Sequence, residues 1–480
     1  MKCRIPLLSI AVLMGLSIIS LALAADKEHI YYGYVPPSSD ISQYWQVVEL
    51  INGTYYNYSA PPGTALLDIV GTEDGTEVKV IDLATGDVIA KARLSKFGKF
   101  TCFIPYGTFF KVVSNKRVLV HMCGGAGYLG YSGGAYCIYP SVSGGFRGKH
   151  FIIIPEKVSD QVTSYYRMGF NILIMGLTKA NFELVDSINK WSFRGSVDQM
   201  KSGKYHAWAR RAEGIEDVGP GYSMVFELKT SDDIQLAAVS TGGFTAVPAV
   251  TGGFVGRLFF APAYISWEAQ GVSAAVLIVP IEPCKVEIYD SSLNLIASKE
   301  FSKEDVAKDQ FWFYSLGDVR KDLVIKSTGD ITVLVGTTNG KVAPEFLGDD
   351  VTFMGARPGQ LLKFYAPTLA VVFVTEDSTV TIDGVSRRMS ADSYVILDRG
   401  VHSVKADCVL IVEILGASTG WSSWGTYLVS PLDIMASFEV PSGFAERKGG
   451  ISPLIIALII VVGGAIAFIY MRKRGLIGKR

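Results

Sequence analysis

Between residues 25 and 450 the hydrophobic pattern changes every few residues, in the manner of strands rather than helices. Some runs alternate apolar and polar residues, as TEVKVID does up to Asp82, whereas the run from Lys111, KVVSNKRVLVHMCGG, alternates and then becomes almost wholly apolar. Alternation is typical of a strand with one buried face. A short continuous apolar run is typical of a strand that is buried on both faces. Long stretches of helical periodicity are rare. We therefore predict an all-β fold for this part of the chain.

The strand pattern repeats four times along the chain. A first block, consisting of an apolar strand, a turn and an alternating strand that ends near an Asp, occurs at 69–82, 174–186, 278–290 and 373–384. The Asp residues of the four copies are Asp82, Asp186, Asp290 and Asp383. Self-similarity at a nearly fixed period is the signature of a repeat architecture, so the four copies predict four units built on one plan.

Two further blocks follow each copy of the first. One is a polar turn leading into an apolar strand, and the other is a strand that ends at a proline: Pro155, Pro262, Pro367 and Pro431. Proline cannot donate a hydrogen bond to a sheet ladder, so it marks the end of that strand. A similar strand, HIYYGYVPP, begins at His29. The last strand of one unit can therefore equally be the first strand of the next.

These blocks predict a modular ectodomain of four β units, the last of them short. Tandem sandwich-like units are the first interpretation, and a propeller-like ring of the same repeats is the alternative. Turn dipeptides such as Asp383-Gly384 agree with tight hairpins in either arrangement. The predicted segments are 1–24 signal peptide, 25–155 unit 1, 156–262 unit 2, 263–367 unit 3, 368–432 unit 4, 433–450 stalk, 451–471 transmembrane helix and 472–480 basic tail.

The amino end has the features of a secretory signal peptide. Lys2 and Arg4 form a short basic region, Ile5–Leu21 is apolar, and Ala22-Leu23-Ala24 is a small-residue cleavage site. Cleavage after Ala24 is the expected outcome. The apolar run is also long enough to remain as an uncleaved anchor, which is the alternative.

The carboxyl end predicts a single membrane span. Residues 451–470, ISPLIIALIIVVGGAIAFIY, contain no charged residue and would form a helix long enough to cross the bilayer. Arg472, Lys473 and Arg474 follow at once, and Lys479 and Arg480 end the chain. Because basic residues favour the cytoplasmic side, the carboxyl terminus is expected in the cytoplasm and everything before the span outside the cell membrane.

Composition narrows the partners and the chemistry. The formal net charge is zero, so no general basic field favours nucleic acid. The five histidines have no metal-ligand spacing, the acidic pairs lack the alternation of a calcium loop, and neither a phosphate-binding loop nor a nucleophile elbow occurs. We therefore predict no catalytic, metal or cofactor-binding residues.

Cysteine and asparagine suggest two kinds of modification. The mature chain would keep an odd number of cysteines, of which Cys123 and Cys137 flank a Gly-rich loop and are the candidate disulfide. Alternatively, all the cysteines are small buried residues. Asn52 and Asn57 each begin an N-x-[ST] sequence in a polar stretch and are candidate glycosylation sites.

Loops that precede the proline-ended strands combine small residues with aromatics. Tyr128 and Tyr131 lie in one of these loops, and Trp421 and Trp424 lie in another. Exposed aromatic side chains on a rigid β scaffold could stack on sugars or anchor a protein partner. The alternative is that they close the ends of their own sandwiches.

The order of the blocks resembles the amino-terminal region of the IgGFc-binding protein over about residues 30–431. The resemblance is carried by the alternating strand that ends in Asp, by polar turns such as VVSNKRVLV and VIKSTGDITVLV, by the Gly-rich loop and by the F-x-x-P strand. It implies an extracellular repeat module for binding or adhesion, and it brings no catalytic residues. The apolar span with its basic tail is also similar to those of archaeal surface proteins.

The sequence thus predicts a membrane-anchored extracellular β-repeat protein that acts in cell-surface binding, adhesion or envelope structure. The expected partner is a protein or a glycan at the cell surface, and no enzymatic activity is expected. The alternative is a surface-anchored glycan hydrolase, which would need two carboxylates facing each other in one cleft.

Overall fold

The computed structural model describes most of the repeat region. The described residues are 28–36, 46–51, 54–59, 61, 63–123, 136–142, 145–153, 171–186, 191–199, 201–206, 216–217, 225–239, 244–248, 253–263, 273–317, 321–338, 351–416 and 426–428. They belong to the first of two compact units, Met1–Glu439. The predicted signal peptide and membrane span lie outside these ranges, and within them no helix is both long and apolar enough to span a bilayer.

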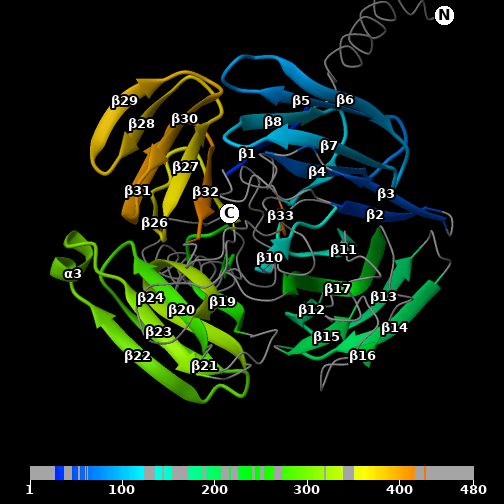
Figure 1. The fold of residues 1–480 in the computed structure, drawn as a ribbon. Helices are drawn as coiled ribbons and strands as arrows, with labels where there is room; N and C mark the ends of the chain where they lie inside the picture. Colours follow the sequence, from blue (N-terminus) through cyan, green and yellow to red (C-terminus); the bar gives the residue numbers. More distant parts are fainter. Residues whose placement is uncertain are drawn as a thin grey trace, which may run out of the picture. The chain divides into compact units, whose positions relative to one another are not determined.

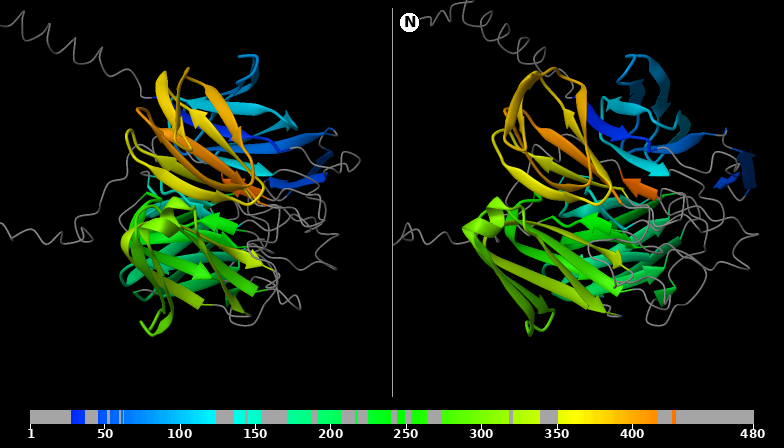
Figure 2. Two further views of the ribbon diagram at one scale, coloured as in Figure 1. Left: turned by 90° about the vertical axis from the view of Figure 1, so that its left-hand side faces the viewer. Right: turned by 60° about the vertical axis from the view of Figure 1, so that its left-hand side comes forward.

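The prediction of an all-β fold is confirmed. Strands make up almost all the regular structure of the described residues, and the helix α3 (Lys303–Ala307) is a single short turn (Figure 1 and Figure 2). Ser302 caps this helix through reciprocal bonds with Asp305, which explains why a turn of helix forms here at all. A separate hairpin is formed by β2 (Gln46–Ile51) and β3 (Thr54–Ser59).

The fourth repeat shows the plan of the units most clearly, because its eight strands form two separate sheets. One sheet has the order β25-β32-β27-β30 and the other β26-β31-β28-β29. The first consists of β25 (Val351–Ala356), β32 (Leu410–Leu415), β27 (Leu369–Val374) and β30 (Ser393–Leu397). The second consists of β26 (Leu362–Ala366), β31 (Gly400–Ala406), β28 (Ser378–Ile382) and β29 (Val385–Met389).

The first repeat has the same two sheets with one difference. Its outer sheet has the order β1-β8-β5-β6, and its inner sheet the order β33-β9-β4-β7. The outer strands are β1 (His29–Tyr34), β8 (Phe109–Ser114), β5 (Thr76–Asp82) and β6 (Val88–Leu94). The inner strands are β33 (Thr426–Leu428), β9 (Val118–Cys123), β4 (Thr64–Gly71) and β7 (Lys99–Pro105). The strand equivalent to β25 therefore comes from the far end of the chain.

In the second repeat one long strand runs through both sheets. The amino-terminal part of β17 (Phe226–Val239) pairs with β11 and β13, and its carboxyl-terminal part with β10 and β12. Its partners are β10 (Tyr136–Tyr139), β11 (Gly148–Ile153), β12 (Asn171–Gly176) and β13 (Ala180–Asp186), and β14 (Trp191–Val197), β15 (Ser202–His206) and the short β16 (Glu216–Asp217) complete the sheet.

The third repeat is built in the same way around β24 (Lys321–Thr338). Its remaining strands are β18 (Phe244–Ala246), β19 (Gly256–Ala263), β20 (Ser273–Pro280), β21 (Cys284–Asp290), β22 (Leu295–Phe301) and β23 (Trp312–Gly317). The eight strand positions of a repeat can be numbered in order, with β33 as position 1 of the first repeat and with β17 and β24 each counted as positions 7 and 8 of their repeats. In every repeat one sheet then has the order 1-8-3-6 and the other the order 2-7-4-5. This is the topology of a jelly roll.

The strands next to Pro155, Pro262 and Pro367 each pair with a later, non-adjacent strand of the same repeat. β11 pairs with β17, β19 with β24, and β26 with β31. The described strand before Pro431, β33, takes the position of β25 rather than that of β26, and it pairs with β9 of the first repeat (Tyr427 opposite Met122).

The repeated Asp residues fix the turn that follows the alternating strand. Asp82 Oδ1 accepts hydrogen bonds from the backbone N–H groups of Ala84 and Thr85, and Asp290 accepts from Ser292 and Asn294 in the same way. In the fourth repeat Asp383 and Gly384 both have positive φ, which a two-residue hairpin turn requires. The regular spacing of Asp in the sequence thus reflects turn chemistry.

Apolar side chains fill the space between the two sheets of a repeat. In the second repeat one buried cluster combines Ile174 of β12 and Leu236 of the carboxyl-terminal part of β17 with Leu184 of β13 and Phe226 of the amino-terminal part of β17. The same cluster includes Val70 and Leu119 of the first repeat. The core is therefore continuous from the first repeat to the second.

Polar contacts join successive repeats in cyclic order. Between the first and second, Arg117 Nη1 donates to the carbonyl oxygen of Val142 at 2.9 Å, and between the second and third, the Ser202 N–H donates to Asp322 at 3.0 Å. Between the third and fourth, Lys363 Nζ lies 2.6 Å from an Asp309 carboxylate oxygen.

The fourth and first repeats are also in contact. Tyr32 Oη donates to Asp392 at 2.7 Å, and Lys111 pairs with the same carboxylate at 2.6 Å. The rings of Phe109 and Tyr394 stack with centroids 3.7 Å apart. Each repeat therefore contacts the next, and the last contacts the first.

Candidate functional site

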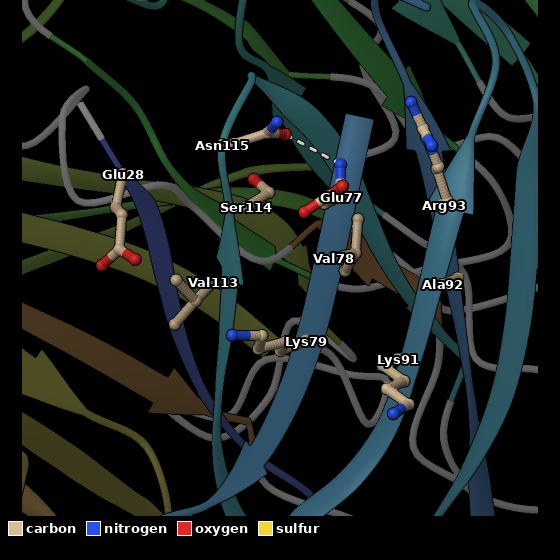
Figure 3. A pocket seen from close by; sticks show the side chains of 10 residues that line it. All are labelled: Glu28, Glu77, Val78, Lys79, Lys91, Ala92, Arg93, Val113, Ser114 and Asn115. Carbon is tan, nitrogen blue, oxygen red and sulfur yellow. Dashed lines mark hydrogen bonds between the residues drawn. The ribbon is translucent and has the colours of Figure 1, made fainter. Parts of the chain in front are cut away.

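A groove lies on the solvent-facing side of the outer sheet of the first repeat. Along β5 the residues alternate between buried and exposed, so that Val78 and Val80 enter the core while Glu77 and Lys79 point outward. Residues of β5, β6 and β8 line a hollow of about 420 Å³, and Glu28, just before β1, completes it (Figure 3). The groove is thus a direct product of strand alternation on a half-buried sheet.

Three basic side chains line the groove. Lys79 of β5 lies directly opposite Lys91 of β6 in the strand register, and Arg93 lies opposite Glu77. All four side chains are exposed. Figure 3 shows Lys91 and Arg93 extending from β6, with Lys79 on the neighbouring strand. Two like charges facing each other across an antiparallel pair are unfavourable, so this Lys–Lys pair is unusual for a sheet surface.

Polar groups of β5 and β8 form the middle of the groove. Asn115 Oδ1 accepts a hydrogen bond from the Glu77 N–H at 2.8 Å (Figure 3). Ser114 Oγ donates to the carbonyl oxygen of Lys116 at 2.7 Å. The carboxylates of Glu28 and Glu77 remain as hydrogen-bond acceptors. The groove therefore offers cationic groups and hydrogen-bond acceptors side by side.

A second polar cluster is buried on the inner sheet of the same repeat. Asp68 of β4 is 1% exposed, accepts a hydrogen bond from Thr101 Oγ1, and lies 3.5 Å from Lys99 Nζ. His121 of β9 is opposite Asp68 in the register and is also buried. Because the Lys99 and Asp68 side chains are only 3% and 2% exposed, this cluster is closed to a ligand and acts within the core.

A third buried group is the carboxyl group of Glu413 on β32. The residue is 0% exposed, and its Oε2 accepts a hydrogen bond from the N–H of Tyr34 at 2.6 Å. Burial raises the pKa of Glu413 well above its ordinary value, although the Tyr34 hydrogen bond acts in the opposite direction. The group therefore lies at the contact between the fourth and first repeats.

The three cysteines whose side chains are described are free thiols. They are Cys102, Cys284 and Cys408. Burial, with a smaller contribution from Asp68, raises the pKa of the Cys102 thiol to about 12, and burial also raises the pKa of Cys284. A thiol with a raised pKa is a poor nucleophile, so neither cysteine has the character of a reactive residue.

The residues that the sequence predicted as sites fall outside the described side chains. Asn52, Tyr128, Tyr131, Trp421 and Trp424 lie outside the described residues. Asn57, Cys123 and Cys137 lie in β3, β9 and β10, where the structure describes the backbone but not these side chains. The glycosylation, disulfide and aromatic-binding predictions therefore stay predictions. Among the described residues no group of His, Cys, Asp and Glu is arranged to hold a metal ion.

The groove was missed in the sequence, although a signal for it is present. The polar positions of β5 and β6 alternate with apolar ones. Once the register of this hairpin is known, the alternation places four charged residues on one face: Glu77, Lys79, Lys91 and Arg93. The turn between the strands sets that register. The contribution of β8 and Glu28 comes from residues distant in sequence and could not be read in this way.

Comparisons with known proteins add little. No protein-family model matches the chain, and no curated protein does. A conserved protein of unknown function from Pseudomonas aeruginosa is similar at 10% identity over 37% of this chain and 89% of its own, with a TM-score of 0.13. A cupin 2 conserved barrel domain protein from Leptotrichia buccalis has 14% identity over 33% of this chain and 84% of its own, with a TM-score of 0.12.

A protein described under the triple jelly roll fold and turret assembly in an archaeal virus has 9% identity over 64% of this chain and 90% of its own, with a TM-score of 0.13. At these TM-scores none of the three likenesses supports an argument about fold or function. The resemblance to the IgGFc-binding protein region also stays a prediction. The described residues themselves form an all-β structure, in which four sets of strands share the sheet order of a jelly roll.

Proposed function

We propose that this protein is a membrane-anchored extracellular scaffold of four jelly-roll repeats closed into a ring, and that it acts in cell-surface binding, adhesion or envelope structure. The observation that supports the ring is the pairing of β33, near the end of the repeats, with β9 of the first repeat, and the surface role rests on the two apolar segments at the ends of the sequence. A strand that returns in this way joins the last part of the repeat series to the first repeat. In a string of independent units, each unit would be complete without such a pairing.

Contacts between repeats support a ring over a string. Besides the polar bonds in cyclic order, aromatic rings pack at two of the junctions: Phe311 with Tyr365 at 4.9 Å, and Phe109 with Tyr394 at 3.7 Å. Closing the series removes two exposed ends, and each junction buries apolar surface that a separate unit would leave in water. A ring of this kind provides a rigid support for surface loops.

The membrane setting of the proposal rests on the sequence. The uncharged stretch at 451–470 and the basic residues after it favour a single span with the carboxyl terminus in the cytoplasm. The signal-like amino end favours export of the repeats. A protein or glycan partner at the cell surface follows from that location, in keeping with the resemblance to the IgGFc-binding protein region.

The topology can be tested with the full-length protein carrying an epitope tag at its carboxyl terminus. Protease added to intact cells should digest the repeats and spare the tag, and permeabilised cells should lose both. Digestion of the tag in intact cells, or protection of the repeats, would contradict the proposal. Retention of envelope material by the detergent-solubilised full-length protein would then separate a binding role from a purely structural one.

A further inference from the structure

The charge pattern of the groove on the first repeat differs from that of the equivalent surfaces in the second and third. Lys79 lies three residues before the repeated turn residue Asp82, and the same position holds Glu183 before Asp186 and Glu287 before Asp290. In the second repeat Glu183 lies opposite Arg194, and the two side chains form an ion pair at 2.9 Å. The second repeat therefore neutralises this surface with its own residues.

The third repeat also neutralises this position internally. Glu287 Oε1 lies 2.7 Å from Lys285 Nζ on the same strand, and Glu287 is opposite the uncharged Ser298. In the first repeat, by contrast, the cross-strand pair is Lys79 with Lys91, and neither amine has an ion-pair partner among the described residues. The same fold position is thus balanced in two repeats and repulsive in the first.

We propose that the groove on β5, β6 and β8 binds an acidic polysaccharide, a polymer that carries carboxylates on hydroxyl-rich sugar rings. The ammonium groups of Lys79 and Lys91, with the guanidinium group of Arg93, would bind the sugar carboxylate. The carboxylates of Glu28 and Glu77 would accept hydrogen bonds from sugar hydroxyls. The hollow of about 420 Å³ is open to solvent on the outer sheet face, where a chain can lie along it.

The mixed lining favours a polysaccharide over nucleic acid. A nucleic acid strand carries a phosphate about every 3.4 Å and needs several cations per site. Here two carboxylates stand among three cations, so the lining has a formal charge of only +1 (three basic minus two acidic residues). A polymer with sparse charge and many hydroxyl groups matches that lining better.

This inference names a ligand class for the surface function proposed above and rests on that function for its biological setting. The decisive variant is Lys79→Glu, which restores the acid–base cross-strand pairing found between Glu183 and Arg194. The substitution should leave the melting temperature unchanged or raise it, because it replaces a like-charge pair with a complementary one. It should also weaken binding of polygalacturonate by about tenfold, because it removes a cation and adds an anion in the groove.

The experiment uses the full-length protein in detergent, with polygalacturonate as the probe and biolayer interferometry as the readout. Arg388→Glu is the matched control, because Arg388 is exposed on β29, the equivalent of β6 in the fourth repeat, and lies outside the groove. Binding that weakens with added salt, is about tenfold weaker in Lys79→Glu and is unchanged in Arg388→Glu would support the proposal. Neutral dextran should not bind.

Three results would overturn the inference: no binding of polygalacturonate by the wild-type protein, equal binding by Lys79→Glu, or tighter binding of duplex DNA than of polygalacturonate through the same residues. These outcomes are distinct from failure of the proposed surface function. Absence of polygalacturonate binding, with repeats that protease still removes from intact cells, would refute only the groove. Digestion of the carboxyl-terminal tag would refute only the topology.

Discussion

Glu413 lies where the fourth repeat meets the first, and its carboxyl group makes that contact sensitive to pH. The residue is fully buried, its Oε2 accepts from the Tyr34 N–H at 2.6 Å, and its Oε1 has no hydrogen-bond partner in the described part of the chain. In the register it lies between the buried side chains of Phe353 and Val371. In the described part of the chain no basic side chain pairs with Glu413, and burial raises the pKa of this carboxyl group.

The direction of the pH effect follows from that raised pKa. Between the pKa of an unfolded glutamate, about 4.3, and the raised pKa of the folded protein, the folded state holds more protons than the unfolded state. The free energy of unfolding therefore falls as pH rises through this window, by at most about 1.4 kcal/mol per pH unit from this one group. The stabilisation is complete below about pH 4.3 and is lost as pH rises through the folded pKa.

Glu413→Gln is the variant that isolates the effect. The amide has nearly the same volume, keeps an oxygen that can accept from the Tyr34 N–H, and cannot ionise. We expect the variant to melt at a higher temperature than the wild type near pH 7 and to lose this advantage at pH 4 to 5. The backbone N–H that donates to Glu413 belongs to Tyr34, and burial raises the pKa of the Tyr34 phenol, so ionisation of this phenol does not account for a change in that range.

Thermal unfolding of the full-length protein in detergent, followed by tyrosine and tryptophan fluorescence at several pH values, measures this difference. Glu300→Gln serves as the control, because Glu300 is an exposed glutamate of β22 and should shift the melting curve little at any pH. If Glu413→Gln and the wild type show parallel dependences on pH, the carboxyl group is not neutral in the folded protein, and the reasoning fails.

Three further predictions concern the buried ion pair, the repeated turns and the returning strand. Asp68→Asn should destabilise the protein by about 3–5 kcal/mol in denaturant unfolding, because it removes the negative charge from the buried pair with Lys99. Glu73→Gln in the exposed pair with Lys116 should change stability by at most about 1 kcal/mol, and similar effects of the two substitutions would contradict a buried charge pair. Asp82→Ala should cost about 1 kcal/mol through loss of two turn bonds and Asp87→Ala almost nothing, and equal values in the same assay would rule out turn capping. A chain that ends at residue 425 lacks β33 and leaves β9 as an unpaired edge strand. It should melt at a lower temperature, and aggregate more in size-exclusion chromatography, than a chain that ends at residue 439. Indistinguishable behaviour of the two chains would remove the main support for a closed ring.

Local chemistry allowed much of the fold to be predicted from the sequence. The alternation in β5 and β13 and the apolar character of β9 identified these segments as strands, because side-chain direction in a strand depends only on position along the chain. Asp82, Asp290 and Asp383 marked turns for an equally local reason, since an Asp side chain bonds to backbone groups a few residues away.

Tertiary structure decided the features that depend on residues distant in sequence. β33 pairs with a strand some 300 residues earlier, and no local pattern in Thr426–Leu428 indicates this partner. In the same way, nothing near Glu413 predicted its burial against Tyr34, and the groove needs β5, β6 and β8 together with Glu28. The sequence by itself therefore determined the strands, their turns and their fourfold repetition, because these follow from short-range periodicity. Long-range contacts alone decided that β33 completes the first repeat and that Lys111 pairs with Asp392.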